Sequence, residues 1–90
     1  FTPTAPEAIT AEATRLRAMQ GAWEARGAEG RAAVLLQWAD ALEKAAGEIT
    51  AALGVDTGRE TIAAIEVQSA IGNIRRWATR GPQLFAALDQ

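Results

Sequence analysis

The chain has 90 residues, a formal net charge of −2, and neither cysteine nor histidine. This length fits one small domain or a piece of a larger one. The weak charge gives no reason to expect nucleic acid or an anionic membrane as a partner. Without cysteine or histidine the chain has no disulfide, no thiolate nucleophile, no zinc–thiolate site and no imidazole base.

The distribution of apolar residues predicts a soluble chain with a thin core. No apolar run approaches the roughly 20 residues that span a bilayer, and the N-terminus lacks the layout of a signal peptide, so we expect a cytoplasmic location. Alanine supplies 22 of the 44 apolar residues. Because alanine favours helix but buries little surface, the composition indicates a fragment or a domain that depends on a partner.

The first predicted helix spans about residues 6–26. Thr4 or Ala5 is its expected N-cap and Pro6 its first residue, where a missing N–H costs nothing. Glycines in the segment 27–30 predict the turn that follows. Apolar residues recur three and four apart, as on one face of a helix: Ile9, Ala13, Leu16, Met19 (or Gln20) and Trp23.

The second predicted helix spans about residues 29–53. Gly47 predicts a break within it, and Gly54 is its expected terminator. Asp40 and Lys44 stand four apart and are placed to form an ion pair on its surface. The expected apolar stripe is Val34/Leu35, Trp38, Leu42, Ala45/Ala46, Ile49 and Leu53.

The third predicted helix spans about residues 61–80 and is expected to end at Gly81-Pro82, because the residue before a proline avoids the helical region. The run 83–88 is compatible with a further short helix. The expected stripe is Ile62, Ile65, Val67 (or Ala70), Ile71, Ile74 and Trp77/Ala78. No stretch alternates in a strand-like way, so the fold class is predicted as all-α with three main helices.

The aromatic and basic residues have ordinary structural interpretations. Trp23, Trp38 and Trp77 fall one to each helix, and aromatic residues on helical stripes are more often core than ligand cage. Arg75 and Arg76 are expected near a helix C-terminus, where cations complement the helix dipole. They do not spread over a face as a nucleic-acid interface requires.

The polar stretch at residues 55–60, Val-Asp-Thr-Gly-Arg-Glu, is the one segment that invites a binding-loop interpretation. It has too few oxygen ligands for an EF-hand and lacks the Gly-Lys-Ser/Thr ending of a phosphate loop. We interpret it as a connection in which Gly58 turns the chain and Asp56 or Thr57 caps the next helix.

No set of nucleophile, base and orienting group can be assembled from this composition. The serine and threonine hydroxyls have no histidine to activate them, and Lys44 is the only lysine. The 90 residues by themselves are therefore predicted to have no enzymatic activity.

A series of short motifs nevertheless follows a recognisable order. The motifs are Met19-Gln20-x-x-Trp23, Gly30-Arg31-x-x-x-Leu35, Trp38-Ala39-Asp40-Ala41-Leu42-Glu43, Ile49-x-Ala51-Ala52-Leu53, Asp56-Thr57-Gly58-Arg59, Glu66-Val67 and Ile74-Arg75-x-x-Ala78. Together they resemble the N-terminal region of NAD(P)-dependent aldehyde dehydrogenases, over about residues 12–85. The chain departs from the family at Gly58-Arg59-Glu60, where Gly-Lys-Pro is usual, and at Arg76, where an aromatic residue is usual.

The resemblance implies the helical start of an α/β cofactor-binding domain in an enzyme that oxidises an aldehyde to a carboxylic acid. The implied cofactor of that parent enzyme is NAD or NADP. Its implied partners are the remainder of the same enzyme, further copies of it as a homo-oligomer, and the aldehyde. The family's catalytic cysteine, general-base glutamate, oxyanion-hole asparagine and dinucleotide-binding glycines lie beyond this segment, so no catalytic or cofactor-binding residue is assigned.

The resemblance also implies two candidate sites. Asp56 corresponds to an acidic residue that contributes to a monovalent cation site in some members. Ser69, Asn73 and Trp77 share a face of the helix that flanks the family's substrate-entry tunnel. The alternative to the enzyme hypothesis is a stand-alone helical interaction or adaptor module without enzymatic activity.

Overall fold

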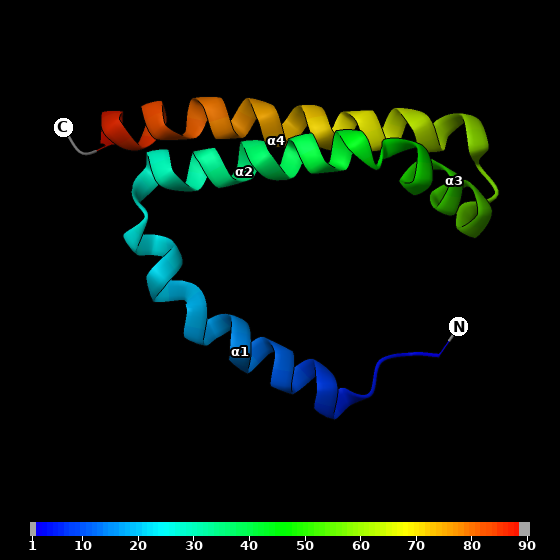
Figure 1. The fold of residues 1–90 in the computed structure, drawn as a ribbon, viewed down its shortest axis with the longest axis horizontal. Coiled ribbons are helices and arrows are strands. Elements are labelled where there is room, and N and C mark those ends of the chain that lie inside the picture. Colours follow the sequence, from blue (N-terminus) through cyan, green and yellow to red (C-terminus); the bar gives the residue numbers. More distant parts are fainter. Residues whose placement is uncertain (1, 89–90) are drawn as a thin grey trace.

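The computed structural model describes residues 2–88, which form four α-helices and no strand (Figure 1). The all-α prediction is therefore confirmed, with one helix more than expected. The helices are α1 (Pro6–Ala25), α2 (Gly27–Lys44), α3 (Ala46–Thr57) and α4 (Glu60–Leu88).

Helices α2 and α4 lie side by side and antiparallel, and α3 packs against the N-terminal part of α4 (Figure 1). Helix α1 leaves the other end of this pair at an angle and contacts only α2 within residues 2–88. We call α2, α3 and α4 together the helical body, and α1 the arm.

The core of the helical body lies where Ala39 of α2 meets Val67 and Ile71 of α4. Ala39 and Ala63 are completely removed from solvent, and Ala78 is 2% exposed. Small side chains along the contact allow two helix backbones to approach closely. Partly buried apolar residues pack against this core: Leu42, Ala46, Ile49, Leu53 and Ile74.

The tryptophan prediction is wrong for two of the three residues. Trp38 and Trp77 are 52% and 57% exposed, and Trp23 is half-buried. The buried residues at the contact between α2 and α4 are the alanines that directly follow these two tryptophans, Ala39 and Ala78. The helices approach so closely that an indole does not fit between them.

The predicted break in the second helix exists but lies at Ala45, not at Gly47. The backbone of Ala45 leaves helical geometry at φ −93° and ψ 2°, and its carbonyl accepts the Ile49 N–H at 3.0 Å. Gly47 falls in the first turn of α3, where backbone N–H groups have no intrahelical acceptor and a glycine costs little.

Of the two glycines predicted to act at the end of this stretch, Gly54 differs from the prediction and Gly58 turns the chain as predicted. Gly54 does not end a helix but lies buried within α3, where an added Cβ would stand 3.4 Å from Glu60 Cγ. The terminator is Gly58, which adopts a left-handed φ of 68° and donates its N–H to the Gly54 carbonyl at 2.8 Å. Asp56 and Thr57 accordingly belong to the last turn of α3 and do not start α4.

The predicted end at Gly81-Pro82 is also wrong, because α4 continues through Pro82 to Leu88. The helical region before a proline is disfavoured by clashes of the proline ring with the preceding N–H and Cβ, and Gly81 lacks the Cβ. The possible helix at 83–88 is therefore the last part of α4. At the other end, Ala5 is the N-cap of α1 and Pro6 its first residue, as predicted.

The turn predicted at 27–30 is shorter than expected. Helix α1 ends at Ala25 and α2 begins at Gly27, whose φ of 73° redirects the chain. Gly30 lies inside α2, where an added Cβ would stand only 3.1 Å from Arg26 Cβ. These two glycines let the arm meet the body through a single linking residue.

The chain is more open than a compact domain of its size. Its radius of gyration is 16.7 Å, whereas about 12 Å is expected for a compact domain of this length. Its accessible surface is 7095 Å², whereas about 5,000 Å² is expected for a compact monomer of this mass. None of the helices between residues 2 and 88 is long and apolar enough to cross a membrane.

Candidate functional site

Asp56, the predicted cation ligand, lies exposed in the last turn of α3. Within residues 2–88 no three acidic side chains gather into a group that could hold a metal ion. The neighbouring Thr57 hydroxyl donates to the Leu53 carbonyl at 2.7 Å and accepts the Arg59 N–H at 3.3 Å. The loop is thus closed by its own hydrogen bonds, and a cation at Asp56 stays a prediction that needs ligands from elsewhere.

The predicted tunnel residues occupy one exposed face of α4. Asn73 and Trp77, together with Leu35 and Ile74, line a shallow open depression between α2 and α4. Ser69 lies one turn earlier on the same exposed face and does not line it. The Asn73 side-chain oxygen accepts a hydrogen bond from Arg76 Nη1 at 3.0 Å. Their role in a substrate tunnel stays a prediction.

An apolar groove of about 230 Å³ lies where α2 and α3 meet α4. One carboxylate, Glu66, stands at its edge, 3.9 Å from Arg59 Nη1. The other lining residues are Leu42, Ile49, Leu53, Val67, Ala70 and Ile71. A groove of this composition favours an apolar side chain or helix face over a charged substrate.

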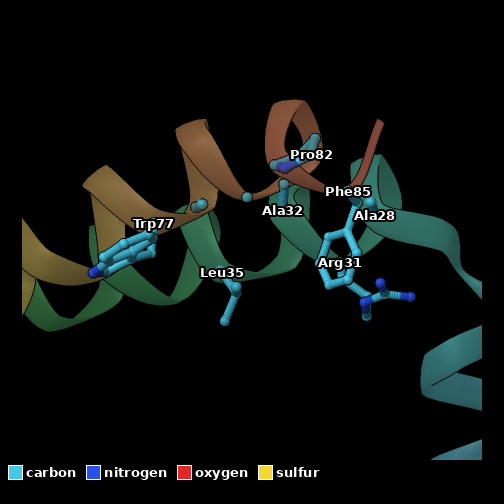
Figure 2. Close-up of a pocket in the computed structure, with 9 residues that line it drawn as sticks. Ala28, Arg31, Ala32, Leu35, Trp77, Pro82 and Phe85 are labelled. Atoms are coloured by element: carbon cyan, nitrogen blue, oxygen red, sulfur yellow. The ribbon is translucent and has the colours of Figure 1, made fainter. Parts of the chain in front are cut away.

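A second apolar hollow, of about 100 Å³, lies where the start of α2 meets the end of α4 (Figure 2). Arg31 and Phe85 border it, and the Arg31 guanidinium carbon lies 5.7 Å from the centre of the Phe85 ring. The remaining lining residues are Ala28, Ala32, Leu35, Trp77, Ala78, Gly81 and Pro82. It exists because α4 continues through Pro82 and brings Phe85 back over α2.

The charged residues of the described chain lie at the surface, and none of them is buried within residues 2–88. Arg75 Nη1 of α4 lies 2.8 Å from Asp40 Oδ1 of α2. Asp40 therefore pairs across the helical body and not with Lys44 as predicted. Arg75 and Arg76 lie mid-helix, so the prediction of a helix C-terminus there is corrected too.

Two ionisable groups on the arm, Glu12 and Arg15, have altered pKa values. Arg15 donates hydrogen bonds to the Glu12 carboxylate, which lowers the pKa of Glu12 and raises the pKa of Arg15. Both side chains are more than half exposed, and the pair follows from their spacing of three residues on one helix face. A surface pair of this kind stabilises a helix and supplies no general acid or base.

Arg31, Pro82 and Phe85 are the residues that sequence reasoning missed. The expected apolar stripe of the second helix does not include Arg31, and Phe85 lies in the run that was compatible with a separate short helix. The glycine before Pro82 was the available signal, since the absence of a Cβ removes part of the clash that disfavours a helix before proline.

The described surface therefore offers apolar grooves and no assembled reactive group. Comparison of the chain with protein-family models, with curated proteins and with solved structures gives no match. The geometry supports binding to another apolar surface more directly than it supports chemistry.

Proposed function

We propose that the chain is a helical docking element, the N-terminal helical part of an NAD(P)-dependent aldehyde dehydrogenase that packs on the α/β remainder of that enzyme. The observation that carries the docking role is the arm: α1 is 20 residues long and has no buried residue. Ile9, Leu16 and Met19 are each more than half exposed.

The exposed area supports a partner of substantial size. The chain shows about 2,000 Å² more surface than a compact monomer of its mass. Burying that excess on one side corresponds to a large, obligate type of interface, since standard complexes bury about 800 Å² per partner. A helix that cannot bury its apolar stripe within its own chain is stabilised by a neighbour that covers it.

The order of the sequence motifs supports the choice of partner. They resemble the helical start of the aldehyde dehydrogenase cofactor domain, in which helices cover a mostly parallel sheet. Residues 2–88 form no strand and no glycine-rich phosphate turn, so the dinucleotide would bind to the remainder of the enzyme. The catalytic cysteine would also come from there, and homo-oligomerisation would belong to the parent enzyme.

The proposal is tested on the complete natural reading frame that contains these residues. We expect it to encode a glycine-rich dinucleotide turn and a reactive cysteine, and the purified protein to oxidise aldehydes with reduction of NAD⁺ or NADP⁺. The isolated 90 residues are the control and are expected to be inactive.

Deleting the arm tests its docking role separately from the assignment of the protein as an aldehyde dehydrogenase. Removing residues 6–25 from the complete protein is expected to lower the yield of soluble, folded enzyme and its melting temperature. An unchanged yield and melting temperature would contradict the docking role of the arm. A reading frame that ends near Gln90, or a full protein inactive on a panel of aldehydes, would contradict the enzyme assignment.

The second candidate is a stand-alone interaction or adaptor module. The helical body favours it, because Ala39, Val67 and Ile71 form a core without help from the arm. A reading frame that ends near Gln90, together with cooperative thermal unfolding of the 90 residues, would support this module over the enzyme part.

A further inference from the structure

The arm is joined to the helical body at one point. Arg26 alone links α1 to α2, and the next residue, Gly27, has a φ of 73°. Trp23 is the one residue of α1 that is partly buried. Most of the arm therefore makes no contact that could fix its angle to α2 and α4. That angle depends on the contacts near this joint.

Arg31 makes contacts at this joint that reach three helices. It belongs to α2, and its Nη1 donates to the Glu24 carbonyl oxygen in the last turn of the arm at 3.0 Å. Its guanidinium carbon also lies 5.7 Å from the centre of the Phe85 ring on α4. Figure 2 shows Arg31 and Phe85 beside each other at the end of the apolar hollow.

The electrostatics of the arm favour this contact. The last carbonyl groups of a helix lack intrahelical donors and carry a negative partial charge. The last turn of α1 contains no basic residue of its own, and Arg26 follows it as the C-cap, with its backbone N–H donating to the Trp23 carbonyl at 3.2 Å. Arg31 adds a side-chain donor and a cation from the neighbouring helix.

The guanidinium group suits a contact with two partners at once. Its planar face can stack on an aromatic ring while its edge donates hydrogen bonds, which a lysine ammonium group cannot reproduce. Arg31 is partly buried, so solvent competes less for it than for the arginines along the exposed face of the arm.

We propose that Arg31 is a latch that sets the angle between the arm and the helical body, by joining the C-terminal end of α1 to Phe85 of α4. The latch holds the apolar face of the arm in a fixed orientation for whatever surface covers it. It concerns the orientation of the arm and does not depend on the identity of its partner.

The test measures the distance between the arm and α4. The chain has no cysteine, so Ala11→Cys on the arm and Gln68→Cys on α4 give two unique positions for spin labels. Pulsed electron resonance on the doubly labelled 90-residue chain is expected to give one narrow distance distribution. Arg31→Ala is expected to raise the population outside that peak by about tenfold, since a hydrogen bond and a cation–π contact are lost together.

Three further variants sharpen the test. Arg31→Lys keeps the charge and loses the stacked plane, so it is expected to broaden the distribution as well. Phe85→Leu keeps apolar volume, and it is expected to broaden the distribution less than Arg31→Ala because the bond to Glu24 remains. Arg76→Ala is the matched control, since Arg76 bonds to Asn73 within its own helix, and the peak is expected to stay narrow.

Two results would overturn the latch. One is a broad distribution in the parent chain, which would mean that no contact fixes the arm. The other is a narrow peak that Arg31→Ala leaves in place while circular dichroism shows the helix content unchanged.

Discussion

The arm and the helical body are built from similar residues and reach different outcomes. Both are rich in alanine, and both place larger apolar residues three and four positions apart. In the body, Ala39 is completely buried between α2 and α4, whereas in the arm no residue is buried. The difference teaches that an amphipathic stripe is enough to specify a helix. The stripe is buried only where another helix packs against it.

The connections decide which helices obtain that surface. The loop around Gly58 folds α4 back along α3 and α2, so that three helices share one core. The joint at Gly27 directs the arm away from the body, and α1 meets only α2. Gly58 and Gly27 thus have similar left-handed φ values. The turn at Gly58 leads to packed helices, whereas the turn at Gly27 leaves α1 away from the body.

The largest expected effect comes from a substitution in the core of the body. Ile71 is 3% exposed, so Ile71→Ala is expected to lower the free energy of unfolding by about 2–4 kcal/mol through lost burial and a residual cavity. Leu16→Ala on the arm is the matched substitution, expected to change it by less than about 0.5 kcal/mol. Urea unfolding followed by circular dichroism measures both. Equal losses would mean that the arm is packed as tightly as the body.

Overpacking the contact between α2 and α4 is expected to have a somewhat smaller effect. Ala39→Leu inserts a larger side chain where none fits and is expected to cost about 1–3 kcal/mol. Ala41→Leu on the exposed face of the same helix is the control, expected to stay within about 0.5 kcal/mol of the parent. Thermal unfolding compares the two, and a tolerated Ala39→Leu would contradict the close approach of the helices.

The smallest expected effect concerns the ion pair on the arm. The hydrogen bonds from Arg15 lower the pKa of Glu12, so helix formation favours the ionised carboxylate. The pair's contribution is therefore present above the ordinary glutamate pKa and is lost as the pH falls through the lowered value. Carbon-detected NMR titration of Glu12 measures this, and Arg15→Ala is expected to return the midpoint towards the ordinary value. Glu7→Gln should leave the Glu12 midpoint unchanged. An unchanged Glu12 midpoint in Arg15→Ala would contradict the effect of Arg15 on the Glu12 pKa.

The helices were largely predictable from the sequence because their signals are local. Pro6 occupies the first position of α1 as its fixed φ predicts, and periodicity identified the helical stretches up to about residue 80. The helix ends were less predictable: Gly54 is buried against Glu60, and α4 continues through Pro82. Ala45 interrupts the helix although alanine favours helix, so propensity did not predict this position.

The candidate sites were less accessible to sequence reasoning than the helices. The face shared by Ser69, Asn73 and Trp77 follows from helical spacing, and all three residues are exposed on α4. The contact of Arg31 with Phe85 joins residues far apart in the chain. Periodicity carries no information about such a contact, because it depends on whether α4 continues past Pro82.

The central claim is that the arm lacks a partner within residues 2–88 while the body has its own core. Hydrogen–deuterium exchange of the 90-residue chain, resolved by NMR to single amides, tests this most directly. We expect amides of α1 to exchange much faster than those around Ala39 and Ile71, whose opening requires unfolding of the core. Protection of α1 equal to that of α2 and α4 would contradict the account, because it would show that the arm is already covered.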